Sequence, residues 1–153
     1  MKLDEQRFLD VIDAAPLVAV DLVIRNEQGK VLLGKRMNKP AQDFWFVPGG
    51  RIRKNERIAD AVRRVSNSEL GAGVEEGEFL GAFDHIYQDN FLGREGINTH
   101  YVAIAYACTL NDRARFTVDS QHSELRWWDV RELLNSNEVH ENTKAYFRPR
   151  SRK

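Results

Sequence analysis

The stretch "PGGRIRKNERIADAVRRVSNSELG", residues 48–71, decides the fold of this chain. It continues a short strand-like segment, 44–50, which ends in a predicted Gly-Gly turn. Apolar side chains then recur every three or four positions over residues 57–70, and this spacing predicts an amphipathic helix. Gly71 stands where helices commonly end. The order of strand, glycine turn and helix has the outline of a motif that handles phosphate groups.

Strand-like and helix-like segments continue on both sides of this stretch. Residues 4–13 have helical spacing and stop before Pro16. Further strands are predicted at 17–26, 30–36, 79–88, 99–110 and 124–130. A last helix begins within 131–136. The pattern predicts an α+β fold, a mixed β-sheet sandwiched between α-helices, in a single domain spanning 1–153.

The composition excludes several classes of protein. The chain has 153 residues, 42% of them hydrophobic and 30% charged, and its net charge is zero, so no overall field favours nucleic acid. No apolar run approaches the ~18 residues of a membrane span, and the first residues are too polar for a signal peptide. We therefore expect a cytoplasmic protein with neither a nucleic-acid nor a membrane partner. The single cysteine, Cys108, lies in an apolar run and predicts a buried thiol.

The stretch 48–71 resembles the Nudix box, but it lacks most of the carboxylates of that motif. The box reads Gly, five residues, Glu, seven residues, Arg-Glu-apolar-x-Glu-Glu-x-Gly-apolar. Here Glu56, Arg64 and the final glycine keep this spacing, whereas Val65 and Ser68 replace two of the three helix glutamates. We expect Glu56 to be structural, pairing with an arginine or capping the helix.

The remaining carboxylate, Glu69, still permits a metal site. Positions 65, 68 and 69 share one helix face, so three carboxylates there would form a dense anionic site. Mg²⁺ prefers six oxygen ligands, but it accepts one or two carboxylates together with water and substrate phosphates. Glu69 can thus anchor one ion. The alternative is that the box is a degenerate scaffold helix, Glu69 is a solvated residue, and the protein binds without catalysis.

The resemblance extends well beyond the box. The stretch "PLVAVDLVIRNEQGKVLLGKRMNKPAQDFWFVPGGRIRKNE", with "THY", "QHSELRW" and "VHENTKAYF", is similar to the GDP-mannose mannosyl hydrolases over roughly residues 3–147. These Nudix proteins carry the same depleted box, and they cleave the sugar C1–O bond with inversion, releasing GDP and free sugar. The resemblance implies hydrolysis of GDP-mannose or GDP-glucose by a homodimer with one Mg²⁺ per subunit, Mn²⁺ being a substitute.

The resemblance also implies a metal site and a base. Mg²⁺ would be held by the Gly49 carbonyl, Glu69 and Gln121, with diphosphate oxygens and water completing the shell. His122, next to a predicted ligand, would be the general base, because imidazole titrates near neutral pH and can accept a proton from the attacking water. The alternative for His122 is an ordinary surface histidine.

Two further residues are implied as catalytic. Asp21 is a carboxylate inside an apolar strand, where it needs a partner or a task. The resemblance places it beside the sugar, where its negative charge favours an oxocarbenium-like transition state. The alternative is an ion pair with Arg51 or Arg64. Arg36, at a strand end, would grip the diphosphate and assist GDP departure, unless it is merely a solvated cation.

Other residues are implied in substrate binding. Those expected to hold sugar and phosphate are Arg36, Arg51, Arg64, His85 and Tyr101. Leu3 and Phe8 are expected to contact the guanosine, across a dimer interface. Tyr101 can equally be a strand-packing aromatic residue, and Phe8 alone would suggest a helix-core residue.

Two other functions compete with glycosyl hydrolysis. The first is a conventional Nudix pyrophosphatase that cuts the P–O–P bond of a nucleoside-diphosphate sugar or nucleotide. The replacement of two box glutamates disfavours it, because that chemistry uses the dense carboxylate site. The second is a nucleotide-sugar-binding module without turnover, which would have no need for a base such as His122 beside the metal.

Overall fold

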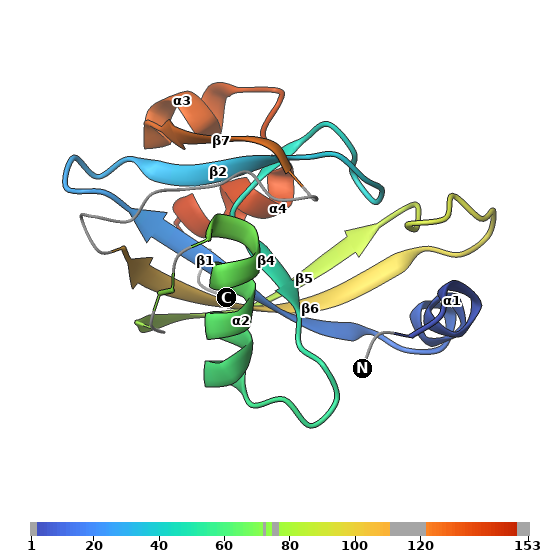
Figure 1. The fold of residues 1–153 in the computed structure, drawn as a ribbon. Helices are drawn as coiled ribbons and strands as arrows, with labels where there is room; N and C mark the ends of the chain where they lie inside the picture. Colours follow the sequence, from blue (N-terminus) through green and yellow to red (C-terminus); the bar gives the residue numbers. More distant parts are fainter. Residues whose placement is uncertain (1–2, 72, 75–76, 111–121, 150–153) are drawn as a thin grey trace.

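The computed structural model describes residues 3–71, 73–74, 77–110 and 122–149. Its elements in chain order are α1 (Glu5–Ala14), β1 (Leu17–Arg25), β2 (Val31–Arg36), β3 (Trp45–Phe46), β4 (Gly49–Arg51), α2 (Ile58–Leu70), β5 (Glu78–Tyr87), β6 (Thr99–Thr109), β7 (His122–Trp128), α3 (Val130–Asn135), α4 (Glu141–Lys144) and the 3₁₀ helix η1 (Ala145–Phe147). Figure 1 shows α2 crossing in front of the central strands, with α1 beside the end of the sheet.

The strands form one mixed sheet. Its order is β3-β2-β1-β6-β5, with β4 added to β1 and β7 added to β2. The central pair, β1 and β6, is parallel, whereas the other pairs are antiparallel. Because β1 lies in the middle of the sheet, its sequence is a nearly continuous apolar run.

Helices cover both faces of β1. Val20, Leu22 and Ile24 point to one face and pack with Val62 of α2 in one core cluster. Val23 points to the opposite face, because side chains alternate along a strand, and it joins a second cluster with residues of β2, β7 and α3. The predicted α+β class, a mixed sheet between helices, is therefore confirmed.

The helix ends follow from local chemistry. The Asp4 carboxylate accepts a hydrogen bond from the Arg7 backbone N–H at 2.8 Å, which caps α1. Gly71 ends α2 in the left-handed conformation at φ 68°, as its position predicted. No helix in the described ranges is long and apolar enough to cross a membrane. Cys108 is buried, also as predicted.

The prediction of a Gly-Gly turn is wrong. Gly49 and Gly50 begin β4 and pair with β1, Gly49 lying opposite Asp21. The two glycines allow β4 to lie close to its neighbours. A Cβ on Gly49 would lie 2.2 Å from Asp21 Oδ1, and a Cβ on Gly50 would lie 3.0 Å from a methyl group of Val65. The pair therefore seats β4 between β1 and α2.

The C-terminal part also differs from the prediction. β7 begins at His122 and ends at Trp128, and Asp129 caps α3 by accepting a hydrogen bond from the Arg131 N–H at 2.9 Å. The short helices α4 and η1 were not predicted, because they are too short to show a helical period.

Candidate active site

A cavity of about 640 Å³ opens beside β1, β4 and α2, and it gathers the predicted site residues. Those that line it are Leu3, Phe8, Asp21, Arg36, Gly49, Arg51, Arg64, Glu69, His85 and Tyr101. Two predicted residues lie outside this description: Gln121 is not among the described residues, and the side chain of His122 is not described either. The cavity thus collects residues that lie between positions 3 and 101 of the chain, although their roles stay predictions.

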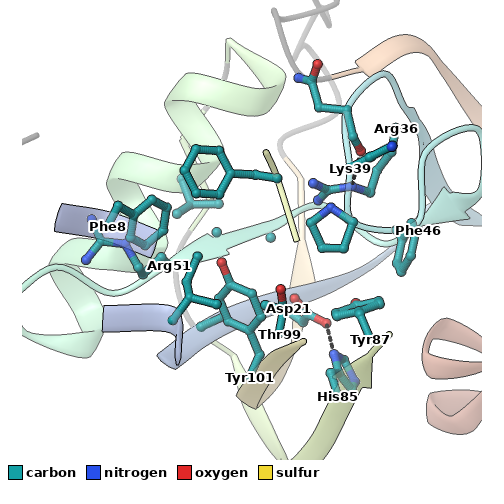
Figure 2. A pocket seen from close by; sticks show the side chains of 18 of the residues that line it. Phe8, Asp21, Arg36, Lys39, Phe46, Arg51, His85, Tyr87, Thr99 and Tyr101 are labelled. Atoms are coloured by element: carbon teal, nitrogen blue, oxygen red, sulfur yellow. Dashed lines mark hydrogen bonds and ion pairs between the residues drawn. The ribbon is translucent and has the colours of Figure 1, made fainter. Parts of the chain in front are cut away.

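One end of the cavity is aromatic and cationic. The Phe8 ring of α1 lies 5.2 Å from the ring of Phe91, measured between centroids. The Arg51 guanidinium lies 4.9 Å above the centre of the Phe8 ring, as a cation–π contact. Figure 2 shows Phe8 and Arg51 side by side, away from Asp21 and His85. Phe8 therefore forms part of the wall of the cavity in its own chain.

The other end holds a buried carboxylate. The side chain of Asp21 is only 15% exposed, and its Oδ2 accepts a hydrogen bond from the Tyr146 hydroxyl at 2.5 Å. His85 Nδ1 lies 3.9 Å from the same oxygen. Burial raises the pKa of Asp21 to about 6, although the hydrogen bond from Tyr146 and the positive charge of Arg36 act to lower it. This end of the cavity thus carries a negative charge that is poorly solvated at neutral pH.

The alternative of an ion pair between Asp21 and Arg51 or Arg64 is wrong for the described structure. The Arg51 guanidinium lies over the Phe8 ring, and that of Arg64 is held by Glu56. Asp21 is instead bonded to Tyr146, a neutral donor.

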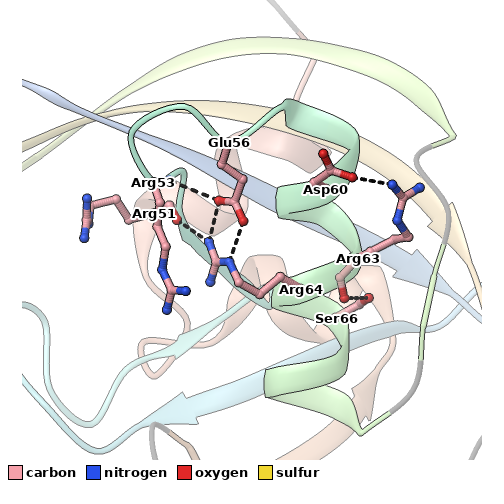
Figure 3. Close-up of polar contacts among 7 residues, drawn as sticks. All are labelled: Arg51, Arg53, Glu56, Asp60, Arg63, Arg64 and Ser66. Carbon is pink, nitrogen blue, oxygen red and sulfur yellow. Dashed lines mark hydrogen bonds and ion pairs between the residues drawn. The ribbon is translucent and has the colours of Figure 1, made fainter. Parts of the chain in front are cut away.

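Glu56, just before α2, and Arg64, in the middle of α2, form a structural pair (Figure 3). Arg64 Nε and Nη2 donate to the two Glu56 oxygens at 2.7 and 2.9 Å, and Nη2 also donates to the Arg51 carbonyl at 2.7 Å. Glu56 Oε1 accepts a further bond from the Arg53 N–H at 3.0 Å. The hydrogen bonds from Arg64 hold the pKa of Glu56 at about 2. The pairing of Glu56 with an arginine is therefore confirmed, and the pair braces β4 against α2.

Replacing Glu56 with glutamine is expected to lower stability in a pH-dependent way. Glu56 stays ionised in the folded protein down to pH about 2, whereas it protonates near pH 4.5 in the unfolded chain. Its contribution is therefore fully present above pH 4.5 and is lost as the pH falls toward 2. Urea unfolding at pH 6 should show the variant on the order of 2 kcal/mol less stable.

At pH 3 more than half of this difference between wild type and variant should be gone. A difference of equal size at both pH values would contradict the depressed pKa of Glu56. Glu78→Gln is the matched control, because Glu78 is exposed at the start of β5, and it should change stability little at either pH.

In a complete Nudix box, one face of the helix carries three glutamates, but in this structure the corresponding face of α2 carries only one carboxylate. Val65 is buried in the core, Ser68 is exposed at the cavity, and Glu69 is buried and lines the cavity. Among the described residues, no group of three or more His, Cys, Asp or Glu side chains is placed to hold a metal ion.

The described residues nevertheless fit a single divalent ion under one condition. The Glu69 carboxylate and the Gly49 backbone both line the cavity, and they supply the oxygen ligands that Mg²⁺ prefers. They are too few to fill its coordination shell. The set therefore fits an ion that takes much of its shell from water and from a bound phosphate ligand.

Arg36 and His122 are neighbours in the sheet. The backbone of His122, at the start of β7, pairs with Arg36 at the end of β2. The Arg36 guanidinium lies 5.8 Å above the centre of the Phe46 ring, and its Nε donates to the Asn38 carbonyl at 3.3 Å. The sheet register thus brings the chain at His122 beside a cation that lines the cavity.

Several cavity residues were not anticipated from the sequence. They are Lys39, Phe46, Tyr87, Phe91 and Thr99. The sequence gives one weak indication that Phe91 has a role, because it is an aromatic residue in an otherwise polar loop. The loop is held by the buried Asn90, whose Nδ2 donates to the carbonyls of Arg94 and Ile97 at 2.8 and 2.7 Å. Loop 88–98 is thereby built to present Phe91 at the cavity.

Comparison with known proteins identifies relatives of this chain. The model of the NUDIX domain family matches residues 15–150. The chain is 44% identical over 126 residues to the low-salt glycan biosynthesis protein Agl8 of Haloferax volcanii, covering 82% of this chain and 78% of that protein. It is 28% identical over 107 residues to the uncharacterized Nudix hydrolase YvcI of Bacillus subtilis, covering 69% and 62%.

Solved structures share the fold. The MutT protein from Methanosarcina mazei Go1 superposes with a TM-score of 0.72 at 21% identity, covering 86% of this chain and 91% of that one. A MutT NUDIX hydrolase from Burkholderia pseudomallei gives a TM-score of 0.71 at 27% identity, covering 86% and 95%.

Proposed function

This chain belongs to the Nudix family, and we propose that it hydrolyses GDP-mannose or GDP-glucose to GDP and the free sugar, by attack of water on sugar C1. The expected products are thus a nucleoside diphosphate and a neutral sugar. The competing reaction is a conventional Nudix cleavage of the P–O–P bond.

The depleted face of α2 is the observation that carries the proposal. Attack at phosphorus in this superfamily is associated with a dense carboxylate site. Here Val65 is buried in the core, Ser68 is a hydroxyl, and only Glu69 is a carboxylate. In a reaction at carbon, the metal has only to neutralise the departing diphosphate, so one ion is sufficient. A bound Mg²⁺, held by Glu69, the Gly49 carbonyl and Gln121, would neutralise charge on the departing diphosphate.

The polarity of the cavity supports a nucleotide sugar as the substrate. Phe8 and Arg51 offer stacking and cation–π contacts, which suit a nucleobase. Arg36 lines the cavity and suits a diphosphate, whose oxygens match the planar guanidinium. Asp21 lies at the end away from Phe8, and it suits a sugar that becomes cationic at C1. The similarity to a protein named for glycan biosynthesis agrees with this class of substrate.

The proposed step is a single displacement. His122 accepts a proton from water as the water oxygen bonds to C1 on the face opposite GDP, which inverts the configuration. The C1–O bond breaks, and its electron pair leaves with the β-phosphate oxygen. The ionised Asp21 stabilises the positive charge that develops on the sugar ring, and Arg36 compensates the negative charge on the leaving diphosphate.

Hydrolysis of GDP-mannose with Mg²⁺ in ¹⁸O-labelled water tests the proposal. Mass spectrometry should find one ¹⁸O atom on free mannose and none on GDP. Label on a phosphate group, with GMP and mannose 1-phosphate as products, would overturn attack at carbon in favour of pyrophosphatase chemistry. Tight binding of GDP-mannose and of GDP-glucose without turnover would overturn both and favour a binding module.

Glu69→Gln is expected to weaken activation by Mg²⁺. The amide is of equal size but neutral, so the Mg²⁺ concentration for half-maximal activity should rise at least about 10-fold. A titration of rate against Mg²⁺ measures this. Asp60→Asn is the matched control on the same helix, because Asp60 is exposed and pairs with Arg63. An unchanged Mg²⁺ dependence for Glu69→Gln would mean that the metal site lies elsewhere.

A further inference from the structure

A tyrosine from the C-terminal part of the chain links two residues of the cavity. Tyr146 lies in η1, and its hydroxyl donates to Asp21 Oδ2 at 2.5 Å. The same hydroxyl oxygen lies 3.2 Å from His85 Nε2. The Tyr146 ring packs edge-on against Phe83, with centroids 4.7 Å apart and planes at 89°. Three elements, β1, β5 and η1, therefore meet at one hydroxyl group.

The number of protons on each group decides which one donates in the hydrogen bonds of Tyr146. A tyrosine hydroxyl has one proton to donate, and a carboxylate oxygen can only accept. The proton of Tyr146 is therefore committed to Asp21, at the shorter of the two distances. The Tyr146 oxygen is left as the acceptor for His85, which must carry its proton on Nε2. His85 is neutral because burial lowers its pKa to about 4.

We infer that Tyr146 is a positioning residue, which fixes both the Asp21 carboxylate and the His85 ring through the chain His85 Nε2–H to Tyr146 O–H to Asp21 Oδ2. The other carboxylate oxygen, Oδ1, is confined by β4, since a Cβ on Gly49 would lie 2.2 Å from it. The carboxylate is thus held from both sides.

The kinetic consequence of this arrangement rests on the proposed function. A charged group that is already oriented toward developing charge needs no reorganisation during the reaction, and this lowers the barrier. Tyr146 reaches the reacting atoms only through Asp21 and His85. Its loss should therefore slow turnover more than it weakens substrate binding.

The tautomer of His85 gives a test that needs no substrate. Long-range ¹H–¹⁵N correlation spectra of histidine-labelled protein distinguish a protonated from an unprotonated ring nitrogen. The chain has four histidines, and loss of one signal set in His85→Gln assigns the relevant one. In the wild type we expect Nε2 protonated and Nδ1 unprotonated. In Tyr146→Phe, which keeps the ring but removes the acceptor, the Nε2–H signal should shift or divide between tautomers.

A protonated Nδ1 in the wild type would overturn the inference, as would a spectrum of His85 that Tyr146→Phe leaves unchanged. Thermal unfolding and near-ultraviolet circular dichroism show whether the variant is folded. If it is not, the tautomer in the wild type still decides the direction of the hydrogen-bond chain.

Steady-state kinetics provide a second test of the positioning role of Tyr146. Tyr146→Phe should lower kcat about 10-fold or more, with KM changed by less than about 2-fold. It should also lower Tm by a few degrees, because the buried Asp21 carboxylate loses its hydrogen-bond donor. Tyr106→Phe is the matched control on β6, because Tyr106 packs against Phe79 and does not line the cavity. An unchanged kcat in folded Tyr146→Phe would overturn the positioning role. If the wild type lacks turnover, the proposed function fails, and the histidine spectra alone decide the inference.

Discussion

Asparagine in place of Asp21 is expected to stabilise the folded protein while slowing turnover by about 10²–10³-fold. Burial raises the pKa of Asp21 from 3.8 to about 6, so the ionised carboxylate opposes folding at neutral pH. A shift of this size corresponds to at most about 3 kcal/mol. Asparagine is neutral and nearly isosteric, and its Oδ1 can still accept the Tyr146 hydrogen bond. The change should therefore raise Tm by several degrees at pH 7.5.

The pH dependence of this stabilisation has a definite sign. A carboxyl group with a raised pKa binds its proton more tightly in the folded state, so the wild type gains relative stability as the pH falls from about 6 toward 3.8. The advantage of Asp21→Asn should thus be present at pH 7.5 and largely lost by pH 4. Thermal unfolding at both pH values, together with kcat at pH 7.5, measures the two effects.

Asp84→Asn is the control for Asp21→Asn. Asp84 directly precedes His85 on β5, and its side chain is 78% exposed. The same chemical change there should alter neither Tm nor turnover appreciably. Unchanged turnover in Asp21→Asn would remove the carboxylate from the reaction. A lower Tm would mean that the ionised group contributes interactions that outweigh its burial.

His122→Gln is expected to slow turnover by about 10²–10⁴-fold, the usual effect of losing a general base. Glutamine is polar and of similar size, but it cannot accept a proton from water at neutral pH. The backbone of His122 pairs with Arg36 in the sheet, so the substitution alters a residue adjacent to the cavity without removing the β2–β7 pairing. Binding of GDP-mannose, measured by calorimetry, should remain within a few-fold of the wild type.

His100→Gln controls for the general effect of replacing a histidine. His100 lies on β6, its side chain is 36% exposed, and it faces Asp84 at 3.4 Å. It is not part of the cavity lining, and its replacement should leave kcat unchanged. If His122→Gln also retains full turnover, His122 has no part in the reaction, and another base must be sought among the residues of the cavity.

Local patterns in the sequence were sufficient to predict α2. The helical period of residues 57–70 and the stop at Gly71 were readable because helix formation depends on neighbours three and four positions apart. For Glu56 the sequence left two structural roles open, pairing with an arginine or capping the helix, and the structure shows the pairing, with Arg64. The loss of two of the three carboxylates from one face of α2, with only Glu69 remaining, followed directly from the residue types.

Only the tertiary structure decided how Asp21 is held. Its partner, Tyr146, is 125 positions away and lies in a 3₁₀ helix too short to show a period. Residue types alone also allow an ion pair with an arginine, because sequence order carries no distance between segments that meet through the sheet. The role of Gly49 also depends on tertiary structure: its small size allows the contact of β4 with Asp21 of β1, which exists only once the strands are paired.

The sequence by itself therefore determined the family, the helix of the motif and the loss of its carboxylates, because these depend on residue types at fixed spacing. The register of β1 against β4 and β6, together with the folding back of η1, decided which side chains meet at Asp21. Those contacts arise from the packing of the whole sheet, so no local stretch of the chain contains them.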